Sequence, residues 1–193
     1  MIIENHLLPL FLPKNSKLIM LGSFPPKCEK WSMDFYYPNI QNDMWRIFGL
    51  IFFKDKNYFL NQKLDKFDKN KIIKFLIKNK IALGDVGQSV IRLKDNASDK
   101  FLSIVKNINL EEILSELIFC NTIVSTGLKS LETLYNILNI KEPLLKTGSF
   151  ITHITYNREL KIYRMPSTSR AYPLKLENKA AIYETMFKSL NII

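Results

Sequence analysis

Two cysteines and two histidines among 193 residues leave the chain few ligands for a metal ion. Two thiols are also too few for a disulfide framework or a four-thiolate iron–sulfur cluster. We therefore expect Cys28 and Cys120 to be unpaired, with Cys120 in the core. His6 and His153 have no serine, cysteine or acid at a spacing typical of a hydrolytic triad, so we interpret both as structural. The sequence predicts neither a metal nor a cofactor.

Long apolar runs are absent as well. No stretch reaches the roughly 18 apolar residues of a membrane span. The first residues lack the basic region of a signal peptide, and Pro9 and Pro13 interrupt their apolar stretch. Hydrophobic residues make up 47% and charged residues 24%, as in ordinary globular proteins. We expect one soluble, cytoplasmic domain over residues 1–193, acting as a monomer and without a membrane.

Positive charge is in excess. The 28 lysines and arginines exceed the 18 acids by ten, which gives a net charge of +10. A basic surface on a small domain favours a polyanion as partner, with nucleic acid first. Only five of the 28 are arginines, however, and surface lysines can serve solubility alone. The charge therefore favours a nucleic-acid partner without deciding the question.

Short apolar runs alternate with segments of helical period. The expected strands are 17–21, 81–83 and 122–126, with a hairpin from 151–156 and 160–163; the expected helices are 43–53, 70–79, 110–117, 128–138 and 174–190. This order predicts an α/β domain with a mostly parallel sheet and helices on both faces. Ligands of such sheets bind beyond the carboxyl ends of the strands. The loops that follow Leu21, Leu83, Thr126 and Tyr163 are therefore the places to search for a site.

The loop after the first strand is rich in proline and aromatic residues. Residues 22–26 read Gly-Ser-Phe-Pro-Pro, and residues 36–45 read Tyr-Tyr-Pro-Asn-Ile-Gln-Asn-Asp-Met-Trp. Aromatic side chains in a loop can stack on an unpaired base. They can equally cover the core, and the residues alone leave both interpretations open.

The loop after the last strand combines hydroxyls with an arginine. Residues 165–173 read Met-Pro-Ser-Thr-Ser-Arg-Ala-Tyr-Pro and lead into a helix. This composition suits contacts to phosphate groups. Alternatively, Ser167 or Thr168 serves only to cap the helix.

Together these segments resemble the uracil-DNA glycosylase superfamily, whose first and second motifs follow the first and last strands of the sheet. The tract 36–45 is similar to the Tyr-Tyr, then Asn-x-x-Trp, pattern of the hypoxanthine-DNA glycosylase branch, and it echoes the mismatch-specific uracil/thymine branch. The resemblance runs in order from residue 17 to about 173. It implies a three-layer α/β/α sandwich around a central, mostly parallel, four-stranded sheet.

Two positions depart from the superfamily pattern. Phe24 stands where most members carry an Asp or Asn before the first-motif proline, and Met165 stands where the second motif often begins with His or Asn. The hypoxanthine branch also lacks the first-motif acid and offers an asparagine ahead of the tryptophan, here Asn42. Asp85 is the rival catalytic group, although it could equally cap a following helix or pair with Arg92.

The resemblance implies hydrolysis of an N-glycosidic bond in DNA. The enzyme would flip a damaged or deaminated nucleotide, hold the leaving base and place a water at C1′. Asn42 would orient the water, or Asp85 would act as base. The base-binding candidates are Gly22, Ser23, Phe24, Tyr37 and, as a second-choice amide, Asn39. The DNA-binding candidates are Pro166, Ser167, Thr168, Ser169, Arg170 and Tyr172, of which Arg170 or Tyr172 would fill the vacated stack.

Three functions remain open from the sequence. The first is a monofunctional glycosylase that removes uracil or hypoxanthine. The second, motivated by Phe24 and Met165, is a catalytically silent DNA-binding or damage-sensing protein of the same fold. The third is a small-molecule binder. The glycosylase hypothesis requires the pair Tyr36 and Tyr37 to line one pocket with Asn42, facing the serine–threonine turn. The polar stretch 94–99 could also reach this pocket.

Overall fold

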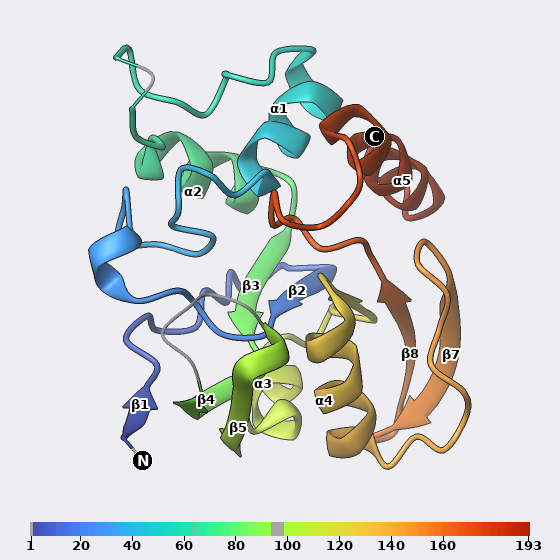
Figure 1. Ribbon diagram of the computed structural model, residues 1–193. Helices are drawn as coiled ribbons and strands as arrows, with labels where there is room; N and C mark the ends of the chain where they lie inside the picture. Colours follow the sequence, from blue (N-terminus) through green and yellow to red (C-terminus); the bar gives the residue numbers. More distant parts are fainter. Residues whose placement is uncertain (1, 64, 94–98) are drawn as a thin grey trace.

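The computed structural model describes residues 2–63, 65–93 and 99–193, and its centre is a five-stranded sheet (Figure 1). The strand order is β3-β2-β6-β8-β7. The strands are β2 (Leu18–Gly22), β3 (Ile81–Asp85), β6 (Thr122–Ser125), β7 (Phe150–Thr155) and β8 (Arg158–Arg164). β3, β2, β6 and β8 run parallel, and β7 joins the edge antiparallel to β8. The expected four parallel strands are therefore confirmed, with β7 as an additional edge strand.

Helices cover both faces of the sheet, which confirms the predicted α/β/α sandwich (Figure 1). α1 (Met44–Phe53), α2 (Lys69–Lys78) and α5 (Leu176–Ser189) pack on one face; α3 (Leu110–Glu116) and α4 (Leu128–Leu138) pack on the other. Successive strand side chains point to opposite faces. Leu18 and Met20 of β2 accordingly enter the first core, while Ile19 and Leu21 enter the second. Cys120 is buried in the second core, as expected.

The predicted hairpin is the β7–β8 pair. Tyr156 and Asn157 connect its strands with φ angles of 48° and 56°. Two consecutive residues with positive φ match the right-handed twist of the flanking strands, which is why such turns close tight hairpins.

A second, antiparallel sheet was not expected. It has the order β1-β4-β5 and consists of β1 (Ile3–Asn5), β4 (Gly87–Arg92) and β5 (Leu102–Asn107). The interpretation of Asp85 as a helix cap is therefore wrong, because the segment after it forms β4. The pairing with Arg92 is also not seen, since Arg92 forms its ion pair with Glu4 at 2.9 Å.

Two negative findings limit the chemistry of the described residues. No helix among them is long and apolar enough to cross a membrane. Within the same residues, no three His, Cys, Asp or Glu side chains are grouped so that they could hold a metal ion.

Candidate functional site

Polar side chains converge where β2 and β3 end. Gly22 lies opposite Asp85 in the register of these parallel strands. A Cβ atom at position 22 would overlap Oδ1 of Asp85 and would lie 3.6 Å from the phenol oxygen of Tyr37. Glycine at position 22 therefore lets the Asp85 carboxylate lie across the end of β2, facing Tyr37. We call Gly22, Ser23, Tyr37, Asp85 and Thr126 the strand-end cluster.

Tyr37 enters this cluster through an unusual backbone conformation. Its φ angle is 52°, in the left-handed region that residues other than glycine seldom occupy. The Tyr37 hydroxyl shares a hydrogen bond of 2.9 Å with Oγ1 of Thr126, which follows β6 directly. Burial and, second, the charge of Asp85 raise the pKa of the Tyr37 phenol far above its usual value. The phenol is thus protonated at neutral pH.

The neighbouring Tyr36 has a different role. It is 1% exposed, belongs to the core and donates its hydroxyl to the carbonyl of Pro9 at 3.1 Å. The expectation that the tyrosine pair lines one pocket is therefore wrong for Tyr36, which covers the core. Tyr37 alone reaches the strand ends, and its stacking on a base stays a prediction.

His6 is the partner of Asp85. Nε2 of His6 lies 2.9 Å from Oδ2 of Asp85, and the two side chains are 10% and 8% exposed. Nδ1 of His6 lies 2.9 Å from the Leu8 carbonyl oxygen and 3.2 Å from the Leu8 nitrogen, so both ring nitrogens have polar partners. The ring of Phe24 packs edge-on against His6 with centroids 5.2 Å apart. His6 therefore fixes one oxygen of Asp85 and leaves the other, Oδ1, over Gly22. Sequence reasoning missed this contact.

Asp99 adds a second carboxylate. Its Oδ1 accepts a hydrogen bond of 2.6 Å from the Ser23 hydroxyl. Burial is the main cause that raises the pKa of Asp99, and the charge of Asp85 adds to it against the opposing effects of Ser23 and Lys129. Because the Ser23 hydroxyl donates its proton to Asp99, Ser23 Oγ can only accept hydrogen bonds from other partners. The rest of the polar stretch, residues 94–98, lies outside the described residues.

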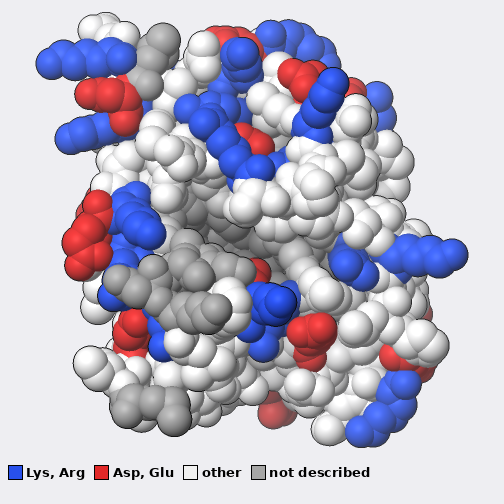
Figure 2. All heavy atoms as spheres, in the orientation of Figure 1, with Lys and Arg blue, Asp and Glu red and all other residues white. Residues whose placement is uncertain are grey.

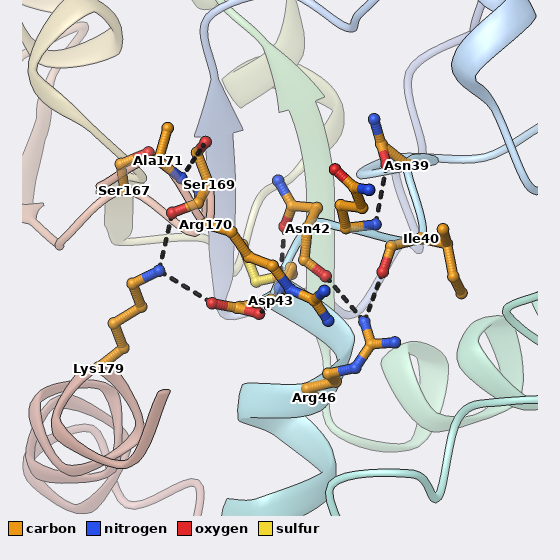
Figure 3. Close-up of polar contacts among 12 residues, drawn as sticks. Asn39, Ile40, Asn42, Asp43, Arg46, Ser167, Ser169, Arg170, Ala171 and Lys179 are labelled. Atoms are coloured by element: carbon orange, nitrogen blue, oxygen red, sulfur yellow. Dashed lines mark hydrogen bonds and ion pairs between the residues drawn. The ribbon is translucent and has the colours of Figure 1, made fainter. Parts of the chain in front are cut away.

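Asn42 lies beside the loop that follows β8. Asn42 and Ser169 form an isolated antiparallel bridge, and the Asp43 N–H donates to the Thr168 carbonyl at 2.8 Å. Figure 3 shows the Asn42 side chain next to Ser169 and Arg170. Its Oδ1 accepts from the Met44 N–H at 2.9 Å at the start of α1, which orients the carboxamide. The structure therefore brings Asn42 to the serine–threonine turn.

The turn borders the strand-end cluster. A Cβ atom on Gly127 would lie 3.8 Å from Cβ of Ser167, and Gly127 directly follows Thr126. The Met165 N–H also donates to the Ser125 carbonyl at 2.8 Å, which ties the segment after β8 to the end of β6. The phosphate-binding candidate Ser167 thus lies next to the segment that carries Thr126 of the strand-end cluster.

The hydroxyls of the turn differ in exposure. Thr168 is only 2% exposed, so Ser167 and Ser169 are the two that solvent reaches. Ser167 Oγ accepts from the Ser169 N–H at 3.3 Å, and Ser169 Oγ accepts from the Ala171 N–H at 3.2 Å. Both O–H groups are therefore available to donate to a ligand.

The remaining predicted residues shape the loops. Pro166 is buried, and its carbonyl accepts from the Tyr183 hydroxyl at 3.0 Å. Tyr172 is half-buried, with its N–H bonded to the Ser169 carbonyl at 3.1 Å. Asn39 uses Oδ1 to accept from the Gln41 N–H at 2.8 Å, a local turn contact.

A buried ion pair holds the turn against α1. Lys179 of α5 is 0% exposed and donates to Oδ2 of Asp43 at 2.9 Å and to the Ser169 carbonyl at 2.8 Å (Figure 3). The second oxygen of Asp43, Oδ1, accepts from Nε of Arg170 at 3.2 Å. Nothing in the sequence distinguishes Lys179 from the other lysines, so this contact could not be anticipated.

Comparison with known proteins finds similar solved structures. No family model matches the chain, and no curated protein matches it. The chain is similar to a solution NMR structure from Methanosarcina acetivorans that is described as a "putative Uracil DNA glycosylase". The two are 20% identical with a TM-score of 0.64, over 98% of this chain and 99% of the other. The chain therefore has the uracil-DNA-glycosylase-like α/β/α fold that its two loop motifs predicted.

Proposed function

We propose that this protein is a monofunctional DNA glycosylase that hydrolyses the N-glycosidic bond of a deaminated base, uracil or hypoxanthine, flipped out of DNA. The observation that carries the proposal is the bridge between Asn42 and Ser169. It joins a carboxamide able to orient water and a turn able to bind phosphate, at the carboxyl edge of a parallel sheet where ligands of this architecture bind. The M. acetivorans protein of similar fold supports the same activity.

The strand-end cluster supplies the surroundings of the flipped base. The face that Figure 2 shows is hollowed near its centre, where an extruded base can enter. The Ser23 hydroxyl donates to Asp99 and the Tyr37 hydroxyl to Thr126, which itself donates to the Leu21 carbonyl, so both oxygens offer lone pairs to the N–H edge of a base. These acceptors can bind an N–H group of the base and hold the base in one orientation.

Hydrolysis then needs only a placed water. The C1′–N bond breaks with its electron pair passing to the base, and the sugar becomes an oxocarbenium-like cation. The Met44 N–H uses one lone pair of Asn42 Oδ1, and the second can accept a hydrogen bond from a water. The water oxygen bonds to C1′ and gives up one proton, for which Asp85, held by His6, is the predicted acceptor.

The test is an excision panel on duplexes that carry uracil, hypoxanthine, xanthine or a thymine mispair. We expect the wild type to release at least one deaminated base and Asn42→Ala to lose about 100-fold or more of the single-turnover rate. Asn109→Ala is the matched control, because Asn109 also accepts from a helix-start N–H (Glu112, 3.3 Å) but lies on α3. Loss of one such cap costs about 1 kcal/mol in either variant. A wild type that leaves every base intact would refute the proposal.

A catalytically silent DNA-binding protein is the second candidate. It is favoured by Phe24, which packs against His6, and by Met165, which is 1% exposed, since neither offers a polar catalytic atom. That function predicts DNA binding with a steep salt dependence and no released base. Our proposal includes action as a monomer in the cytoplasm; chromatographic mass and cell fractionation would test these two points.

A further inference from the structure

Two guanidinium groups lie beside Asn42. Arg46 is in the first turn of α1, and its Nη1 donates to the carbonyls of Ile40 at 2.7 Å and Asn42 at 3.2 Å. Arg170 extends from the serine–threonine turn, where Asp43 holds its Nε. Figure 3 shows both guanidinium groups on the same side of Asn42. Each is anchored through part of its fork, so its remaining N–H groups are positioned without further ordering.

The charges around these groups do not balance. Asp43 is a carboxylate shared by Arg170 and the fully buried Lys179. Among the ion pairs of the described residues, no other acid contacts Arg46 or Arg170. Because Lys179 and Asp43 neutralise one another, the charges of the two arginines remain.

The arginines also repel each other. Burial and, second, the charge of Arg170 lower the pKa of Arg46, whereas Asp43 opposes the shift. The guanidinium of Arg46 additionally lies 5.2 Å from the centroid of Phe67, a contact that limits its movement away from Arg170. An anion placed between the two would remove the repulsion and satisfy their free N–H groups.

Hydroxyl donors complete the surroundings. Ser167 and Ser169 accept backbone N–H groups through Oγ and keep their own protons for a ligand. Basic side chains also line the upper rim of the central hollow in Figure 2. An anion with several oxygens, shared between arginine forks and serine hydroxyls, is the chemistry of a phosphodiester group.

We infer that Arg46 and Arg170 together clamp one phosphodiester group of DNA beside the flipped nucleotide. The inference rests on the proposed function. It adds Arg46, which sequence reasoning did not single out, and it assigns Arg170 to the same phosphodiester group. Since Asp43 holds Nε of Arg170, the side chain binds the backbone at the turn and does not fill the vacated base stack.

The experiment measures binding of undamaged duplex DNA at several salt concentrations. Each neutralised phosphate contributes about 0.9 to the slope of log K against log salt. We expect Arg46→Gln and Arg170→Gln each to reduce the magnitude of the slope by up to about 0.9. The double variant should also lose about 0.9 in total, because both side chains serve one phosphate. Lys141→Gln, an equal change of charge at an exposed position after α4, should leave the slope unaltered.

Each outcome has one meaning. A loss of about 1.8 in the double variant, as two separate phosphates would give, or no loss, overturns the clamp. If a glutamine variant fails to fold, Arg46→Lys and Arg170→Lys, which keep the charge but not the fork, should retain the slope and bind about 3- to 10-fold more weakly; unaltered affinity overturns the clamp. Excision by the wild type distinguishes the two proposals, because a clamp without excision refutes only the glycosylase, and excision without the slope change refutes only the clamp.

Discussion

Removal of the Lys179 ammonium should damage the fold far more than removal of an exposed one. Lys179→Met keeps an apolar stem of similar length but leaves the 8% exposed Asp43 side chain with only the half-exposed Arg170 as a partner. It also removes one of the two donors to the Ser169 carbonyl and leaves the Tyr172 N–H. Breaking a buried pair from one side costs about 3–5 kcal/mol, because the remaining charge stays buried.

Urea unfolding measures this loss. With a denaturant dependence of about 2 kcal/mol per molar urea, a loss of 4 kcal/mol would lower the midpoint by about 2 M. Lys188→Met is the control, because Lys188 is 64% exposed and its surface pair with Glu184, at 3.0 Å, contributes little to stability. Adding Asp43→Asn to Lys179→Met should restore part of the stability, since no charge is then left buried. The reasoning is refuted if Lys179→Met and Lys188→Met unfold within about 1 kcal/mol of each other.

Two further variants probe the strand-end cluster. Gly22→Ala should cost about 1–3 kcal/mol in urea unfolding and impair base excision, because its methyl group displaces the Asp85 carboxylate; an alanine variant as stable and as active as the wild type would contradict this geometry. Burial raises the pKa of Asp99 above 3.8, so its ionisation weakens the folded state above the raised pKa, and this penalty vanishes as the pH falls below 3.8. Asp99→Asn should therefore melt above the wild type near pH 7, with the difference closing toward pH 4; a lower melting temperature at pH 7 would show that ionised Asp99 stabilises the protein.

The main sheet and its helices were predictable because their signals are local. The buried runs of β2, β3 and β6 and the helical period of α1 and α2 lie within single stretches of about ten residues. The helix bounds differ from expectation by two residues at most. β4 was missed because its stability comes from β1 and β5, and β1 lies more than 80 residues away in the chain.

The residues of the candidate site also separate into those with a local sequence signal and those without one. Asn42 and the turn at Ser169 were found because each stands in a recognisable motif beside a strand or helix end. His6 and Lys179 could not be found, and Asp99 was reached only as part of a polar stretch, because their partners are 79, 136 and 76 residues distant along the chain. A contact of that separation leaves no periodic trace, so only the folded backbone reveals which of many charged residues make it.

The left-handed backbone at Tyr37 has a consequence for how the site loses its shape. A glycine would adopt this conformation freely, whereas an L-residue with a side chain gives up roughly 1–2 kcal/mol there. The ring is therefore held in place by Trp45 and Thr126 and not by the preference of its own loop. When heat or denaturant loosens these neighbours, the loop lowers its free energy by leaving the left-handed conformation. Local opening of the loop around Tyr37 should therefore precede the cooperative unfolding of the sheet.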